Sequence, residues 1–174
     1  MALTKIPEEM IDASAGSADE VLTTDGTDAT WEAAGGGKVL QIVYTSNSTE
    51  ATSTSSSYAN TAHTVTITPA GTSSKILVGV SFSAGIERAS TTEANGIYKL
   101  RNTTDSADLV EAVYQVNATS GALGMWSSQT LIGVDTGRAD ATVYYLQYKS
   151  DGTSEIYVNN SNDPGQMWAI EFSS

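Results

Sequence analysis

The chain has no cysteine and only one histidine among its 174 residues. Without cysteine it can form no disulfide, offer no thiol nucleophile and build no cysteine-ligated zinc site. The single histidine, His63, excludes a histidine-rich metal site and is the one residue on which a Ser-His-Asp triad could depend. No nucleophile motif lies near it. We therefore expect no catalytic residue, no metal site, no cofactor and no enzymatic activity.

Basic residues and long apolar runs are also scarce. The net charge is −12, and residues 1–37 hold one lysine against eight acidic residues. Because phosphate binding needs clustered Lys and Arg, nucleic acid is not an expected partner, and the acidity is interpreted as serving solubility. No apolar run approaches the roughly 18 residues that span a bilayer, and the start lacks the basic and apolar blocks of a secretory signal. We expect synthesis in a cytoplasm and no membrane insertion.

The chain does contain a regular series of short β-prone runs in residues 38–174, separated by Gly, Asn, Asp, Ser or Pro. The expected strands are 39–45, a Ser/Thr-rich run ending near 58, 64–68, 75–84, 96–101, 108–116, 123–134, 141–149, 155–158 and 166–172. The run 75–84 is the most strongly patterned, because its alternate residues Ile76, Val78, Val80 and Phe82 share one face. It is predicted to be the central strand.

This series predicts an all-β fold, an antiparallel jelly-roll-like sandwich over residues 38–174. The Ser/Thr-rich residues 49–61 have the composition of a linker, but we interpret them as a strand because Thr suits a half-exposed pleat. Residues 143–148 are apolar on both faces. That pattern predicts that part of the outer face there is buried between subunits.

Residues 1–37 are predicted to form a separate, short, extended attachment and oligomerisation segment. A helical turn is expected at residues 7–13 and a hairpin around Asp25-Gly26, followed by a flexible joint of three glycines. Apolar side chains on so short a segment need a partner surface. The predicted attachment residues are Ile6, Met10, Ile11, Val21, Leu22 and Trp31.

Candidate receptor contacts lie in loops of the sandwich, where binding residues usually concentrate. The polar residues 85–95 are expected to form such a loop, with Arg88, Glu93 and Asn95 as its contact residues. Trp126 is interpreted first as a buried sandwich residue, and alternatively as an exposed aromatic that stacks on a sugar. Carboxylate pairs such as Asp105 with Asp108 could in principle cleave glycosides, but turn formation and solvation explain them.

The order of several sequence blocks resembles a domain that closes many tail-fibre and other virion proteins of tailed bacteriophages, especially marine ones. The blocks are VLQIV (39–43), VTITP (65–69), TSSKILV (72–78), IYKLRN (97–102), ATVYYLQ (141–147), IYVN (156–159) and MWAIEF (167–172). Residues 18–31 are similar to a connector common in phage fibres, and residues 1–5 to a frequent start of such proteins. The resemblance covers residues 38–174.

The resemblance implies a homotrimer with a jelly-roll head like those of complement C1q and tumour necrosis factor. It implies a non-enzymatic virion structural protein: a short trimeric fibre, made in the host bacterial cytoplasm, whose residues 1–37 dock on capsid, portal or tail and whose head binds a host cell-surface glycan or protein. The alternative is a capsid decoration or head-fibre protein, favoured by the lack of a long shaft. A polysaccharide depolymerase is a third hypothesis, disfavoured because no patterned acidic cleft is visible.

Overall fold

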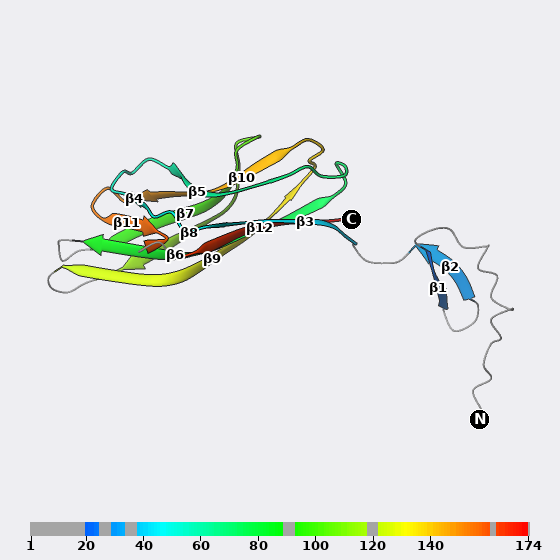
Figure 1. Cartoon of the computed structure of the whole chain (residues 1–174), viewed down its shortest axis with the longest axis horizontal. Helices are drawn as coiled ribbons and strands as arrows, with labels where there is room; N and C mark the ends of the chain where they lie inside the picture. Colours follow the sequence, from blue (N-terminus) through cyan, green and yellow to red (C-terminus); the bar gives the residue numbers. More distant parts are fainter. Residues whose placement is uncertain are drawn as a thin grey trace, which may run out of the picture. The chain divides into compact units, whose positions relative to one another are not determined.

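The computed structural model describes residues 20–24, 29–33, 38–88, 93–117, 122–160 and 163–173. The chain divides into two compact units, residues 1–37 and 38–174. In the first unit, β1 (Glu20–Thr24) and β2 (Ala29–Ala33) form an antiparallel hairpin (Figure 1), as the sequence predicts. The predicted turn and the predicted helical turn lie outside the described residues. The role of this unit in attachment stays a prediction.

In its described residues, the second unit contains ten strands, which run lengthwise (Figure 1). They are β3 (Val39–Asn47), β4 (Ala51–Ser53), β5 (Ala59–Ile67), β6 (Lys75–Arg88), β7 (Ala94–Asn102), β8 (Ala107–Val116), β9 (Leu123–Thr136), β10 (Thr142–Ser150), β11 (Glu155–Val158) and β12 (Gly165–Phe172). No helix in the described part of the chain is long and apolar enough to cross a membrane.

The strands of the second unit pair in a nested order. Antiparallel pairs join β7 to β8, β6 to β9, β5 to β10, and β3 to β12. Two further pairings, β10 with β7 and β12 with β6, assemble these pairs into two sheets. The small sheet has the order β5–β10–β7–β8, and the large sheet has β3–β12–β6–β9, with β11 and β4 beside the far end of β6. Nested antiparallel pairs shared between two sheets are a jelly roll, so the predicted all-β sandwich is confirmed.

The long strand β6 holds the large sheet together. It pairs with β9 over its whole length, with β12 over residues 75–81 and with β11 over residues 84–87. Its inward side chains are at most 2% exposed: Ile76, Val78, Val80, Phe82, Ala84 and Ile86. They face the buried residues Tyr98, Tyr144 and Leu146 of the small sheet in one core cluster. The prediction of a central strand is confirmed, and the strand runs on to Arg88.

The prediction of a strand through residues 49–61 is only partly right. β4 covers three of these residues and β5 begins at Ala59, while residues 54–58 are not in a strand. In that stretch, the amide of Ser55 donates to Ser53 Oγ and the amide of Ser57 donates to Ser55 Oγ, each at 3.0 Å. Such local side-chain bonds compete with the hydrogen bonds of a sheet, which explains why the strand is interrupted.

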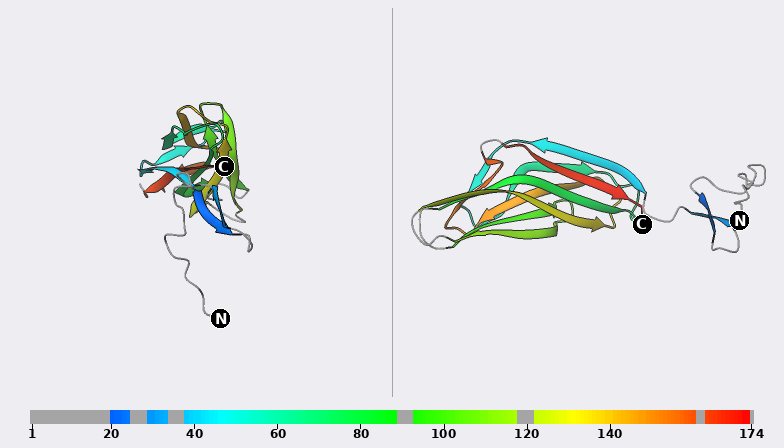
Figure 2. Two further views of the ribbon diagram at one scale, coloured as in Figure 1. Left: turned by 90° about the vertical axis from the view of Figure 1, so that its right-hand side faces the viewer. Right: turned by 90° about the horizontal axis from the view of Figure 1, so that it is seen from below.

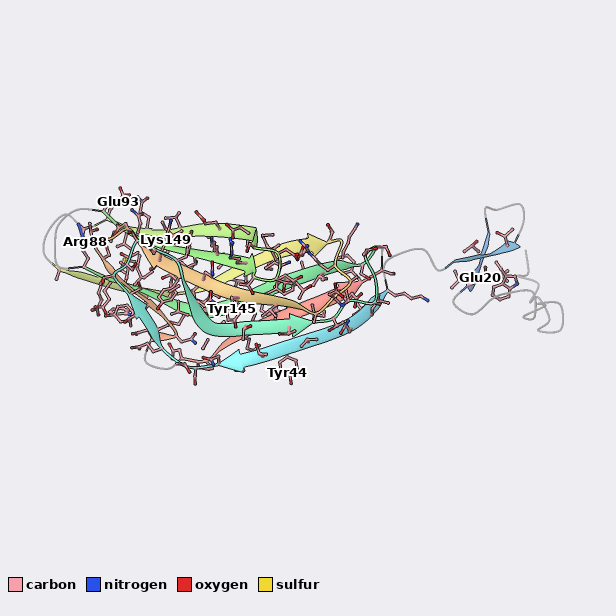
Figure 3. All side chains as sticks on the ribbon, turned by 90° about the horizontal axis from the view of Figure 1, so that it is seen from above. Glu20, Tyr44, Arg88, Glu93, Tyr145 and Lys149 are labelled. Carbon is pink, nitrogen blue, oxygen red and sulfur yellow. The ribbon has the colours of Figure 1, made fainter. Side chains whose placement is uncertain are left out.

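The two ends of this unit differ. Lys38 and Ser173 lie at the same end, because the amide of Lys38 donates to Ser173 Oγ and the amide of Ser173 donates to the Lys38 carbonyl, both at 2.9 Å (Figure 2). At the opposite end, the end of β6 meets the start of β9 and strand β11. Figure 3 shows Arg88 and Glu93 there. We call this the distal end.

Candidate functional site

The outer face of the large sheet carries two apolar rows. Directly paired residues on neighbouring strands point to the same face, so the strand register identifies the members of each row. The first row is Ile42, Ile170, Leu77 and Val134. The second row is Tyr44, Trp168, Gly79 and Ile132. Together these eight residues, from β3, β12, β6 and β9, form what we call the apolar face.

The apolar face is open to solvent in the single chain. Tyr44 is 75% exposed, Ile42 61% and Ile132 52%, and Tyr44 points away from the sheets in Figure 3. The Trp168 ring lies flat over β6, since a Cβ placed on Gly79 would come within 2.3 Å of Trp168 Cζ2. Glycine at position 79 therefore lets the indole lie close to the strand. Large contiguous apolar surfaces on soluble proteins are commonly interaction sites.

The outer face of the small sheet is polar and charged by contrast. Lys99 Nζ lies 3.0 Å from Asp108 Oδ2, and Arg101 also bonds to Asp108. Lys99 and Lys149 place their amines 3.8 and 4.4 Å from the ring centroid of Tyr58. These cation–π contacts and ion pairs are typical of a solvated surface. The predicted burial between subunits beside residues 143–148 concerns this face, because their outward side chains Val143 and Tyr145 lie on it. That burial stays a prediction.

A polar belt borders the apolar face on its distal side. The next row of the large sheet is Ser46, Gln166, Ser81 and Thr130. Ser83 and Ser128 follow as a directly opposed pair. The belt separates the apolar face from the distal end, so the two regions can serve different purposes.

Beyond the belt, the distal end of the large sheet combines aromatic rings with carboxylates. One row holds Tyr157, Gly85 and Trp126, and the next holds Glu155, Glu87 and Gly124. A cavity of about 720 Å³ opens here, and its described lining includes Glu87, Arg88, Trp126, Ser154 and Glu155. We call it the distal cavity. An open pocket with aromatic and convergent polar groups is where ligands usually bind.

Of the four predicted receptor residues, the structure places Arg88 and Trp126 in the lining of the distal cavity, whereas Glu93 and Asn95 are not part of that lining. Arg88 is a strand residue, only 5% exposed, in the cavity wall, so its assignment to a solvated loop is wrong. Trp126 is 44% exposed, which contradicts the interpretation as a buried residue and fits the alternative. Asn95 Nδ2 donates to Glu93 Oε1 at 2.8 Å, and the Asn95 amide donates to Asp151 beside the cavity.

The residues of the cavity that the sequence analysis missed are Glu87, Glu155 and Tyr157. Glu87 and Glu155 lie directly opposite each other on β6 and β11, a pairing that only the strand register reveals. Tyr157 Oη donates to Glu87 Oε2 at 3.0 Å, and Glu155 lies close enough to act on the phenol as well. Burial and these two carboxylates raise the pKa of Tyr157, which keeps the phenol a proton donor.

The predicted attachment residues fall into two groups. Ile6, Met10 and Ile11 lie outside the described residues. Val21 and Leu22 are exposed on β1, and Leu22 lies directly opposite the half-buried Trp31 of β2. Their part in attachment stays a prediction.

His63 is a structural residue. It is fully buried on β5, and its Nε2 lies 3.0 Å from Asn159 Oδ1. Asn159 Nδ2 donates to the carbonyls of Asn47 and Thr49, which leaves Oδ1 as the acceptor and gives Nε2 the proton. His63 Nδ1 has no hydrogen-bond partner in the described part of the chain. Burial lowers the pKa of His63 more than the Asn159 bond raises it, so the neutral ring is favoured.

Asp135 and Asp105 are held in structural hydrogen bonds. Asp135 is buried and accepts hydrogen bonds from Asn102, Tyr144 and Arg138 at 2.8 to 3.0 Å. Burial raises the pKa of Asp135, but these bonds outweigh it and the pKa is lowered overall. Arg138 also donates to Asp105 at 2.7 Å. Within the described residues, no group of three or more His, Cys, Asp and Glu could hold a metal ion.

Comparisons with known proteins give only a weak structural likeness. No protein-family profile and no curated protein matches the chain. One similar solved structure is a mutant VP2 protein of infectious bursal disease virus from derived T=1 particles, with 11% identity and a TM-score of 0.33, covering 87% of this chain and 40% of that one. Another is the VP2 subviral particle of the same virus, with 11% identity and a TM-score of 0.33, covering 90% and 42%. The chain thus spans less than half the length of these proteins.

His63 predicts a pH dependence of stability. Because its pKa is lowered on folding, the unfolded chain binds more protons below about pH 6.5, and the free energy of unfolding falls as pH drops through that value. One histidine can contribute at most about 1.4 kcal/mol per pH unit to this slope. Urea unfolding at several pH values measures it. His63→Gln removes the only imidazole and should flatten this slope, whatever its effect on stability at pH 7.5. Equal slopes in the parent chain and the variant would contradict the conclusion that His63 causes this pH dependence.

Proposed function

We propose that this protein is a non-enzymatic structural protein of a tailed-bacteriophage virion, a short homotrimeric fibre on the particle surface. Residues 1–37 attach it to capsid, portal or tail proteins, and the distal end of the jelly-roll unit binds the host surface. The apolar face is the observation that carries this proposal. The order of sequence blocks resembles that of phage fibre domains. This resemblance supports a bacteriophage virion, rather than another particle, and a homotrimer, rather than another oligomer.

The occupant of the apolar face is proposed to be another copy of the chain. Eight apolar positions lie in register across four strands, and a polar belt borders them, which is the pattern of an apolar interface core with a polar rim. Full burial of an exposed side chain of this size contributes about 1.5–3 kcal/mol, and here the gain comes mainly from the exposed parts of Ile42, Tyr44 and Ile132. Together these gains oppose the entropy cost of association. Homo-oligomers with closed symmetry are the commonest soluble assemblies.

A capsid decoration protein is the second candidate, and it differs in what covers the apolar face. In that case a shell protein, rather than a second copy, packs on these strands. Both candidates leave the distal cavity away from the covered face, beyond the polar belt. They differ in the oligomeric state of the purified chain.

A charge placed in the apolar face should prevent assembly. Ile132→Glu puts a carboxylate at the β9 end of the second row, and its burial would cost several kcal/mol, so we expect a monomer. Val113→Glu is the matched control, because Val113 is similarly exposed, at 58%, but lies on the outer face of the small sheet. Size-exclusion chromatography with light scattering gives the masses. A monomeric parent chain would favour the decoration protein, and a trimeric Ile132→Glu variant would rule out this face as the interface.

Removal of residues 1–37 should separate attachment from assembly. The compact unit 38–174 contains the apolar face, so we expect the shortened chain to keep its oligomeric mass. Because it lacks the proposed attachment segment, we expect it not to be incorporated into particles. The check is immunogold or cryo-electron microscopy of particles produced with the full or the shortened chain. Loss of the oligomer would assign assembly to the first unit instead, and incorporation of the shortened chain would overturn the attachment role.

A further inference from the structure

The geometry points to the distal cavity as a binding site for an uncharged pyranose, a neutral hexose unit of a glycan. This inference rests on the proposed function for its setting, since it names the ligand class of the adhesive end. The cavity presents the Trp126 ring and the opposed carboxylates Glu87 and Glu155, with Ser154 in its wall.

Trp126 forms a flat aromatic platform. Cβ atoms placed on Gly85 and Gly124 would come within 2.5 and 2.6 Å of its ring, so the indole lies flat over β6 and β9. The residue is still 44% exposed, so part of it remains free at the cavity. The face of an aromatic ring is electron-rich and attracts the weakly positive C–H groups on one face of a pyranose. The ring therefore suits a flat, saturated ring with C–H groups on one side.

Glu87 and Glu155 supply acceptors for hydroxyl groups. Like charges directly opposite each other on paired strands destabilise a sheet, so this pair costs stability in the free chain. Tyr157 donates its one phenol proton to Glu87, so within the described residues most acceptor sites of the two carboxylates stay open. A ligand that brings several hydroxyl donors would relieve this arrangement. Carboxylates form hydrogen bonds with hydroxyl groups that are stronger than neutral ones.

Ser154 is an independent sign of a missing partner. Its residue is only 2% exposed, it belongs to the cavity lining, and its Oγ has no hydrogen-bond partner within the described residues. A buried hydroxyl without a partner is rare in folded proteins. The Ser154 Oγ is itself closed to solvent, so a sugar hydroxyl would bond to it only after a turn of the side chain toward the cavity.

The charges of the lining select against acidic sugars. Glu87 and Glu155 carry two negative charges, and Arg88 supplies one positive charge in the described lining. A carboxylated sugar would add a third negative charge beside the pair, whereas a neutral pyranose adds none. We therefore expect neutral hexoses to bind and uronic acids to bind at least tenfold more weakly.

The test uses the full chain with methyl α-glucoside, methyl α-galactoside and methyl α-mannoside, with glucuronate as the acidic probe and tetramethylammonium as the cationic one. Saturation-transfer NMR detects contact, and titration gives the dissociation constants. We expect at least one neutral glycoside to bind, Trp126→Ala to weaken it about tenfold or more, and Glu87→Gln to weaken it several-fold. Glu111→Gln is the matched control, because Glu111 accepts a hydrogen bond from Tyr58 on the small sheet as Glu87 does from Tyr157. It should leave the affinity unchanged.

Three results would overturn the inference: no binding of any neutral glycoside, equal or tighter binding of glucuronate or tetramethylammonium, or binding that survives both cavity variants. Oligomeric mass is measured on the same samples. If the chain is an oligomer but binds none of the three glycosides, the pyranose site is overturned and the structural role remains. A monomer that still binds a glycoside through Trp126 overturns the assembly proposal but keeps the site.

Discussion

The alternation of inward and outward side chains along β6 is the constraint on which the rest of the structure depends. On one side of this strand, the alternate residues from Ile76 to Ile86 are almost fully buried in the core. Because it pairs with β9 along its whole length, the same register that buries this side also aligns the outward residues of β3, β12 and β9. A slip of one residue would turn the buried side outward, so core packing fixes both the interior and the composition of the outer face.

The outer face of the large sheet is divided by this register into regions of different chemistry. Glycine at 79 and at 85 lets an indole lie flat over β6 in each of two regions, with Trp168 in the apolar face and Trp126 at the distal cavity. The serine and threonine rows between them keep the aromatic groups apart. The outer face of the small sheet differs from that of the large sheet. It carries ion pairs and a cation–π contact instead of apolar rows.

The fold was largely predictable from the sequence, since turn residues punctuate the strands and alternation marks the central one. One part of it was not. Local hydrogen bonds between Ser53, Ser55 and Ser57 interrupt the expected strand, and composition cannot distinguish them from strand-compatible hydroxyls. The candidate site was predictable only in fragments: Arg88 and Trp126 were named, but Glu87 and Glu155 are 68 positions apart in sequence and meet only through strand pairing. The apolar face had a signal in residues 39–44 and 167–172. Both runs carry apolar residues at odd as well as even positions, so both faces of each strand are largely apolar.

The central claim is that the apolar face of the large sheet is covered by another copy of the chain. A cryo-electron microscopy or crystal structure of the purified full chain tests it most directly. The account predicts a closed trimer in which Tyr44, Trp168 and Ile132 contact a neighbouring copy while the distal cavity stays open. A monomer, or an oligomer in which these three side chains face solvent, would contradict it.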